Sequence, residues 1–129
     1  MPHDRRLTRR LLLQSAAAAA LASGATSRAL AASEPRTLLI LGGTGFIGPH
    51  LTEQAIARGW KVTHFNRGKR KPEGIAGVEQ LTGDRDGQLD ALKGRKWDAV
   101  IDNSGYVPRI VRMSAELLAP NAGLYLFVS

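Results

Sequence analysis

The stretch that most constrains this chain is LLILGGTGFIG, residues 38–48, in which an apolar run ends abruptly at closely spaced glycines. Gly42, Gly45 and Gly48 fit the spacing G-x-x-G-x-x-G, and Gly43, Gly45 and Gly48 also fit G-x-G-x-x-G. Glycines at such positions allow backbone conformations that side chains disfavour, and they let a phosphate group approach the main chain. Because the motif follows an apolar run and opens an amphipathic pattern, it predicts a strand, a tight turn and a helix.

The free N–H groups at the start of such a helix attract an anion, and the helix dipole adds to the attraction. We therefore predict a dinucleotide cradle, with the alternative that the segment is a glycine turn that holds no ligand. The residues expected to contact the cofactor here are Gly42, Thr44, Gly45, Phe46, Ile47 and Gly48.

The rest of the chain alternates short apolar runs with amphipathic segments, which is typical of a parallel sheet with helices on its faces. Strands are expected at residues 37–41, 61–65, 78–81, 98–102 and 124–128, and helices at 46–58, 89–92 and 108–118. Ile47, Leu51 and Ala55 recur every four residues, so they are expected on the buried face of the first helix. The predicted fold class is α/β, a Rossmann-like doubly wound parallel sheet of about five strands.

The residues after the second expected strand bear on the choice of cofactor. NAD sites commonly place an acid there, which binds the ribose 2′-hydroxyl. This chain has Asn66 and Arg67 instead, and a guanidinium suits a 2′-phosphate. We therefore predict that the cofactor is NADP in preference to NAD. The alternative, a solvated basic loop, fits Lys69–Lys71 better than it fits Arg67.

Polar residues also follow the third and fourth expected strands. Ligands of open α/β sheets lie outside the carboxyl ends of the strands, so these positions are candidates for contacts to the adenine, ribose and pyrophosphate. Each is also a common turn or helix-capping residue. Asp102 is interpreted as a strand-end or capping acid, with a general base as the alternative. The candidate cofactor-binding residues at these two ends are Asp84, Arg85, Asn103 and Ser104.

The first 31 residues have the three-part layout of a secretory signal: arginines, an apolar stretch at residues 11–22, and a small-residue Ala29-Leu30-Ala31 site. The apolar stretch is too short and alanine-rich for a stable membrane span. Thr8 to Gln14 resembles the bacterial twin-arginine signal, which implies export of an already folded protein through that machinery, to the periplasm. We expect a signal at 1–31 and a nucleotide-binding domain at 32–129, with an ordinary secretory signal as the alternative.

Composition excludes several other classes of site. The net charge of +7 falls to +3 without residues 1–31, because 13 basic and 10 acidic residues remain, so no nucleic-acid partner is expected. A weaker hypothesis places nucleic acid on Lys69–Lys71. The chain has no cysteine, and its three histidines lie far apart in sequence, so no metal site is expected.

The stretches LLILGGTGFIGPHL, VTHFNRG, LTGDRD, DAVIDNSGY and YLFVS resemble the extended short-chain dehydrogenase/reductase family, in its NAD-dependent epimerase/dehydratase group. They cover residues 37–129 in the right order. The resemblance implies a Rossmann fold with NAD(P) across the strand ends. It also implies oxidoreductase, epimerase or dehydratase chemistry on a small polar, often sugar-like, substrate.

Catalysis in that family uses a Tyr-x-x-x-Lys pair, which this sequence lacks. Tyr106 is followed four residues later by Ile110, and Tyr125 by Ser129, so no catalytic residue is carried over. The apolar run at 124–128 would form an open sheet edge, a hazard that proteins usually avoid. We therefore expect the chain to be the cofactor-binding part of a longer enzyme. The alternative is a non-catalytic dinucleotide-binding module, such as a redox sensor or an adaptor.

Overall fold

The computed structural model describes residues 33–69 and 75–129, and the residues from Pro35 onward form one compact unit. The predicted signal at 1–31 lies outside the described residues, as do residues 70–74 of the loop after the second strand. The main elements are β1 (Thr37–Leu41), α2 (Gly48–Ala57), β2 (Lys61–Asn66), β3 (Glu79–Thr82), β4 (Trp97–Asp102), α3 (Pro108–Leu118) and β5 (Ala122–Phe127). Two short 3₁₀ turns, η1 (Asp90–Leu92) and η2 (Ala119–Asn121), complete them.

The five strands form one parallel sheet in the order β3-β2-β1-β4-β5. After β1 the chain adds β2 and then β3 on one side of β1. It then crosses back and adds β4 and β5 on the other side of β1. The strand order therefore reverses between β1 and β4, which is where α/β sheets of this kind bind ligands. The predicted Rossmann-like sheet is confirmed.

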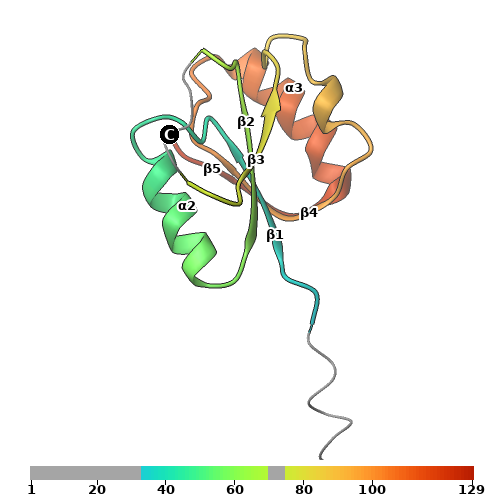
Figure 1. The fold of residues 1–129 in the computed structure, drawn as a ribbon. Coiled ribbons are helices and arrows are strands. Elements are labelled where there is room, and N and C mark those ends of the chain that lie inside the picture. Colours follow the sequence, from blue (N-terminus) through green and yellow to red (C-terminus); the bar gives the residue numbers. More distant parts are fainter. Residues whose placement is uncertain (1–32, 70–74) are drawn as a thin grey trace, which may run out of the picture. The chain divides into compact units, whose positions relative to one another are not determined.

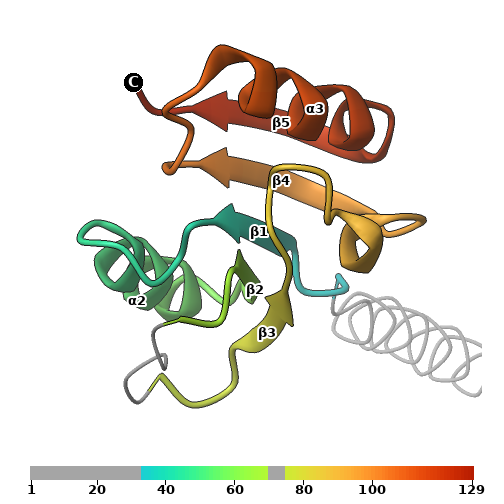
Figure 2. The same ribbon diagram turned by 90° about the horizontal axis from the view of Figure 1, so that it is seen from above.

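The two helices cover opposite faces of the sheet (Figure 1). Successive residues of β1 point to opposite faces, so Leu38 and Ile40 join one apolar cluster while Leu39 and Leu41 join the other. The first cluster includes Ala55 of α2, and the second includes Leu118 of α3. Seen from above, β1, β4 and β5 lie side by side with their arrows pointing to the same side, and the strand direction turns toward β2 and β3 (Figure 2). All neighbouring strands are paired in parallel. The sheet thus presents the loops after all its strands on one side.

Some expected boundaries were wrong. The first helix begins at Gly48 and not at residue 46, so Phe46 and Ile47 lie in the preceding turn, where 93% and 47% of their surfaces are exposed. Ile47 is therefore not on the buried face. That face is made by Gly48, Thr52 and Ala55, because the glycine lets the helix start close to the sheet. Of the expected helix at 89–92, only residues 90–92 are helical, as the 3₁₀ turn η1. Strand β5 begins two residues earlier than expected, at Ala122.

Strand β5 forms one edge of the sheet within the described residues. It pairs with β4 alone, in the register Asp102↔Phe127. Leu124, Leu126 and Phe127 expose 59%, 49% and 41% of their surfaces. The expected apolar edge is therefore present in the structure.

Candidate functional site

The glycine segment after β1 forms a tight turn that packs against two other elements. Gly42 has a φ of 83°, in the left-handed region that favours glycine. A Cβ on Gly42 would lie 2.5 Å from that of Ser104, and one on Gly43 would overlap the ring of His64. A Cβ on Gly48 would overlap the carbonyl of Gly43. These three glycines are thus required by close packing within the protein.

Gly45 differs from these three glycines. The nearest heavy atom to a Cβ built there is the Gly42 carbonyl oxygen, at an ordinary 3.4 Å. Its N–H donates to the same oxygen over 3.1 Å. Packing therefore does not require a glycine at position 45. Gly45 lines a cavity, so a bound group could approach the main chain at this position.

That cavity has a volume of about 540 Å³ and lies at the carboxyl ends of the strands. Small-molecule and cofactor sites commonly have about this size, roughly 300–1,000 Å³. Eight of the twelve predicted cofactor-binding residues line it: Gly42, Thr44, Gly45, Asn66, Arg67, Asp84, Arg85 and Ser104. Phe46, Ile47, Gly48 and Asn103 do not. Sequence reasoning missed the lining residues Phe65, Gly68, Lys69, Gly83, Tyr106, Val107 and Ile110.

The loop after β2 places positive charge at one side of the cavity. Asn66 organises it: its side-chain Oδ1 accepts a hydrogen bond from the Gly68 N–H over 2.8 Å, and Gly68 has a φ of 70°. Arg67, between them, is exposed and forms no ion pair with residues 33–69 or 75–129. Asn66 thus shapes the turn, and Arg67 and Lys69 bring cationic side chains to the lining.

The segments after β3 and β4 complete the lining. The Asp84 side chain closes its own turn by accepting from the Asp86 N–H over 2.9 Å. The main-chain N–H of Asn103 donates to the Leu41 carbonyl over 3.3 Å. With its amide turned so that the nitrogen faces the glycine segment, the Asn103 side chain would donate to the carbonyls of Leu41 and Gly42 as well. Asn103 therefore ties the end of β4 to the glycine segment instead of lining the cavity.

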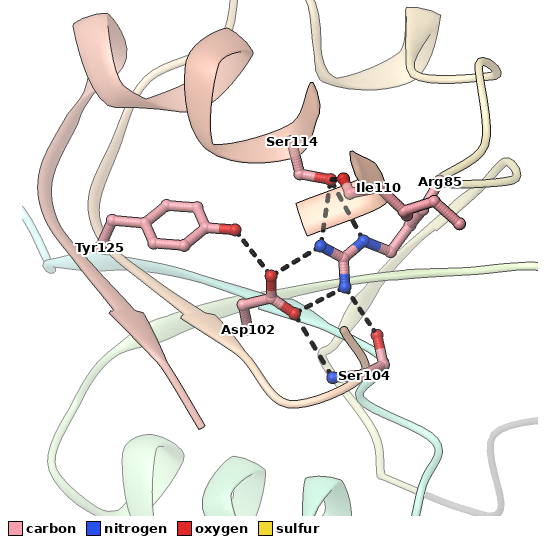
Figure 3. Close-up of polar contacts among 6 residues, drawn as sticks. All are labelled: Arg85, Asp102, Ser104, Ile110, Ser114 and Tyr125. Atoms are coloured by element: carbon pink, nitrogen blue, oxygen red, sulfur yellow. Dashed lines mark hydrogen bonds and ion pairs between the residues drawn. The ribbon is translucent and has the colours of Figure 1, made fainter. Parts of the chain in front are cut away.

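Arg85 is the centre of a buried polar cluster that also contains Asp102, Ser104, Ser114 and Tyr125 (Figure 3). Its guanidinium pairs with both carboxylate oxygens of Asp102, each over 2.6 Å. Its Nε and Nη2 donate to Ser114 Oγ, and its Nη1 also donates to Ser104 Oγ. All five guanidinium donors are therefore used within the protein, although Arg85 lines the cavity. A role in binding the cofactor stays a prediction for this residue.

Asp102 is fully buried and accepts four hydrogen bonds. The one from the Ser104 N–H (3.3 Å) fits the expected strand-end role, but the ion pair and the bond from Tyr125 Oη (2.7 Å) were not anticipated. Burial, followed by the Asp102 contact, raises the pKa of Tyr125, so its hydroxyl stays protonated and donates. The cluster joins β4, β5, α3 and the segment after β3 beneath the cavity.

In residues 33–69 and 75–129, no three acidic or histidine side chains gather as metal ligands do. Across the same ranges, no helix is long and apolar enough to cross a membrane.

Tyr106 lines the cavity and is 90% exposed. Ile110 stands four residues later, at the position that holds lysine in a Tyr-x-x-x-Lys pair. The cationic side chains of Arg67 and Lys69 at the lining are suited to an anionic ligand.

A parallel sheet of this order, with a glycine turn and a cavity at its switch point, defines a Rossmann-type nucleotide-binding domain. The model of the NAD dependent epimerase/dehydratase family matches residues 38–124, and the chain belongs to that family. This match confirms the family resemblance and supports an NAD(P)-binding fold. No curated protein sequence matches the chain.

Solved structures show the same fold at low sequence identity. One is a protein assigned as a short-chain dehydrogenase/reductase from Burkholderia multivorans, which was solved with bound NADP. It is 20% identical to this chain, with a TM-score of 0.64, and the match covers 74% of this chain and 59% of that one. A UDP-galactose 4-epimerase is 19% identical, with a TM-score of 0.59 over 72% and 38% of the two chains. A protein assigned as an epimerase from Bacteroides thetaiotaomicron is 23% identical, with a TM-score of 0.57 over 74% and 48%. The chain thus spans 38–59% of the length of these three proteins.

Proposed function

We propose that residues 32–129 bind NADP, as the cofactor-binding part of an oxidoreductase, epimerase or dehydratase that acts on a small polar or sugar-like substrate. The observation that carries the proposal is the cavity at the switch point, where a Cβ at Gly45 would meet no heavy atom closer than the Gly42 carbonyl oxygen at 3.4 Å. The pyrophosphate would lie against Gly45 and the start of α2, and the 2′-phosphate beside Arg67. When bound, the nicotinamide would supply hydride transfer.

Binding of NADPH and of NADH to the full chain tests this proposal, with Arg67→Ala as the informative variant. A guanidinium–phosphate contact contributes roughly 1.5–3 kcal/mol, so we expect this variant to bind NADPH about 10-fold to 100-fold more weakly. Its affinity for NADH should change less than about twofold, since NADH has no 2′-phosphate. Arg112→Ala, which removes an exposed arginine from α3, is the matched control and should leave both affinities unchanged. Tighter binding of NADH than of NADPH by the unaltered chain would contradict the NADP preference.

A non-catalytic binding module is the second candidate, and one sequence observation favours it: neither tyrosine is followed four residues later by lysine. Both candidates require NADPH binding. They differ in turnover by the full-length protein: a reductase would consume NADPH with a carbonyl substrate, and an epimerase or dehydratase would convert its substrate without net consumption of NADPH. A binding module would do neither.

We further propose that residues 1–31 direct export through the twin-arginine route to the bacterial periplasm. Support comes from the paired Arg9 and Arg10 before a modest apolar stretch. In a fusion to a reporter that is exported only when folded, Arg9→Lys with Arg10→Lys should abolish export. The same change at Arg5 and Arg6 is the control and should leave export intact. Export that survives the first pair of changes would indicate an ordinary secretory signal.

A further inference from the structure

Behind the cavity, four side chains form a continuous chain of hydrogen bonds, which we call the His64 relay: Asn66, Gln80, His64 and Thr52. Asn66 Nδ2 donates to Gln80 Oε1 over 3.2 Å, and Gln80 Nε2 lies 3.3 Å from His64 Nδ1. His64 Nε2 lies 2.7 Å from Thr52 Oγ1, which donates to the Gly48 carbonyl over 2.7 Å. None of Gln80, His64 or Thr52 lines the cavity.

In each hydrogen bond of this relay, the neighbouring hydrogen bonds determine which atom is the donor and which is the acceptor. The Thr52 hydroxyl has a single proton and gives it to Gly48, so Thr52 accepts from His64 and the ring carries its proton on Nε2. Gln80 Oε1 already accepts from Asn66, so its amide nitrogen faces Nδ1, which accepts. Burial lowers the pKa of His64, which agrees with a neutral ring. The relay therefore runs in one direction, from Asn66 to Gly48.

The two ends of the relay lie in the two segments that shape the cavity. At one end, Asn66 Oδ1 holds the Gly68 N–H and so sets the turn that carries Arg67. At the other end, the relay fixes the first residue of α2, Gly48. In its middle, the His64 ring packs under Gly43, where no Cβ would fit. A displacement at either segment must therefore disturb the same set of bonds.

We propose that the His64 relay is a positioning network that couples the loop after β2 to the glycine segment, so that the 2′-phosphate and the pyrophosphate of NADP are bound cooperatively. Gln80 is the specificity-determining member, although it does not touch the ligand. Gln80 lies directly beside His64 in the register of β2 and β3. It is the exposed member of the relay, whereas His64 and Thr52 are buried. This inference rests on the proposed NADP binding.

Gln80→Leu in the full chain removes the hydrogen bonds of Gln80 with Asn66 and His64, at an exposed position of β3. Losing one such bond is expected to weaken NADPH binding about threefold to tenfold and NADH binding less, so the preference for NADPH should shrink. Without cofactor, the amide protons of Gly68 and Gly48 should exchange faster with solvent. Gln54→Leu is the matched control, because Gln54 is an exposed glutamine of α2 whose side chain, among residues 33–69 and 75–129, accepts from Arg58 alone. That variant should leave every one of these measurements unchanged.

Gln80→Glu separates a relay from simple packing, since glutamate has nearly the same size but its carboxylate can only accept. The long-range ¹H–¹⁵N NMR spectrum of His64 should show a proton on Nε2 alone in the unaltered chain. In Gln80→Glu, Nδ1 should gain a proton in order to donate to the carboxylate. A side chain that only filled space would leave the ring spectrum unchanged.

The outcomes distinguish the relay from the proposed function. If the unaltered chain binds neither dinucleotide, the proposed function fails, and the relay is judged by the ring spectrum and the two amide exchange rates. If it binds NADPH and Gln80→Leu keeps the same affinities for NADPH and NADH, the coupling is wrong while the proposed function stands. A proton on Nδ1 of His64 in the unaltered chain would overturn the relay in either case.

Discussion

Replacing Gly45 with valine should weaken NADPH binding by on the order of 100-fold or more, while the domain still folds. The pyrophosphate would be displaced from main-chain N–H groups, and two charge-assisted hydrogen bonds are together worth roughly 3–6 kcal/mol. The fold should tolerate the change because the nearest atom to the new Cβ is 3.4 Å away. Fluorescence or calorimetric titration with NADPH measures the affinity, and circular dichroism checks the fold.

Two further variants show whether the effect arises in the cavity. Gly48→Ala places its Cβ on the Gly43 carbonyl, so it should reduce stability as well as binding. Ala76→Val enlarges an exposed side chain outside the cavity lining and should alter neither. If Gly45→Val bound NADPH as tightly as the unaltered chain, the cavity beside Gly45 would not be the pyrophosphate site.

Replacing Asp102 with alanine should reduce the free energy of unfolding by about 3–5 kcal/mol, the usual cost of removing one partner of a buried ion pair. The Asp102 side chain is completely buried and that of Arg85 is 10% exposed, so the variant would leave the guanidinium charge without a partner and with little water. Tyr125 and the Ser104 N–H would lose their acceptors as well. Domains of this size are stable by only about 5–15 kcal/mol, so this loss is a large share of the total.

Urea denaturation of the full chain, followed by circular dichroism, measures this loss as a lower midpoint. Asp86→Ala is the matched control, because it breaks the exposed ion pair with Arg109 and should change stability little. A midpoint for Asp102→Ala close to that of the control would mean that the buried pair does not stabilise the fold.

Local sequence patterns predicted most of the framework. Apolar runs marked the strands, and the proline at 108 with the apolar positions that follow marked α3, whose bounds agree with the prediction. Proline is favoured in the first turn of a helix, where its missing N–H has no partner to lose. The start of α2 was misplaced because Phe46 and Ile47 continue the apolar pattern, and nothing local shows that the turn extends to Gly48.

The polar contacts beneath the site depend on residues that are distant in sequence. Arg85 and Asp102 are 17 residues apart and Tyr125 lies 23 residues beyond Asp102, so no spacing rule connects them. A strand-end acid after β4 and an arginine after β3 were visible as separate features. Only the fold made them a pair, because β2 and β1 lie between β3 and β4 in the sheet and the segment after β3 brings Arg85 to the end of β4.

The sequence by itself determined where a phosphate could approach the main chain, because glycine spacing after an apolar strand is a local property of the backbone. It also predicted Arg67 as the residue beside the 2′-phosphate of the proposed NADP. The tertiary structure alone decided which glycines have no room for a Cβ. At Gly42, Gly43 and Gly48 the space is taken by Ser104, by His64 and by the Gly43 carbonyl, respectively, whereas Gly45 has no such close neighbour. The tertiary structure also brought Gln80 beside His64, because strand register is set by the packing of the whole sheet.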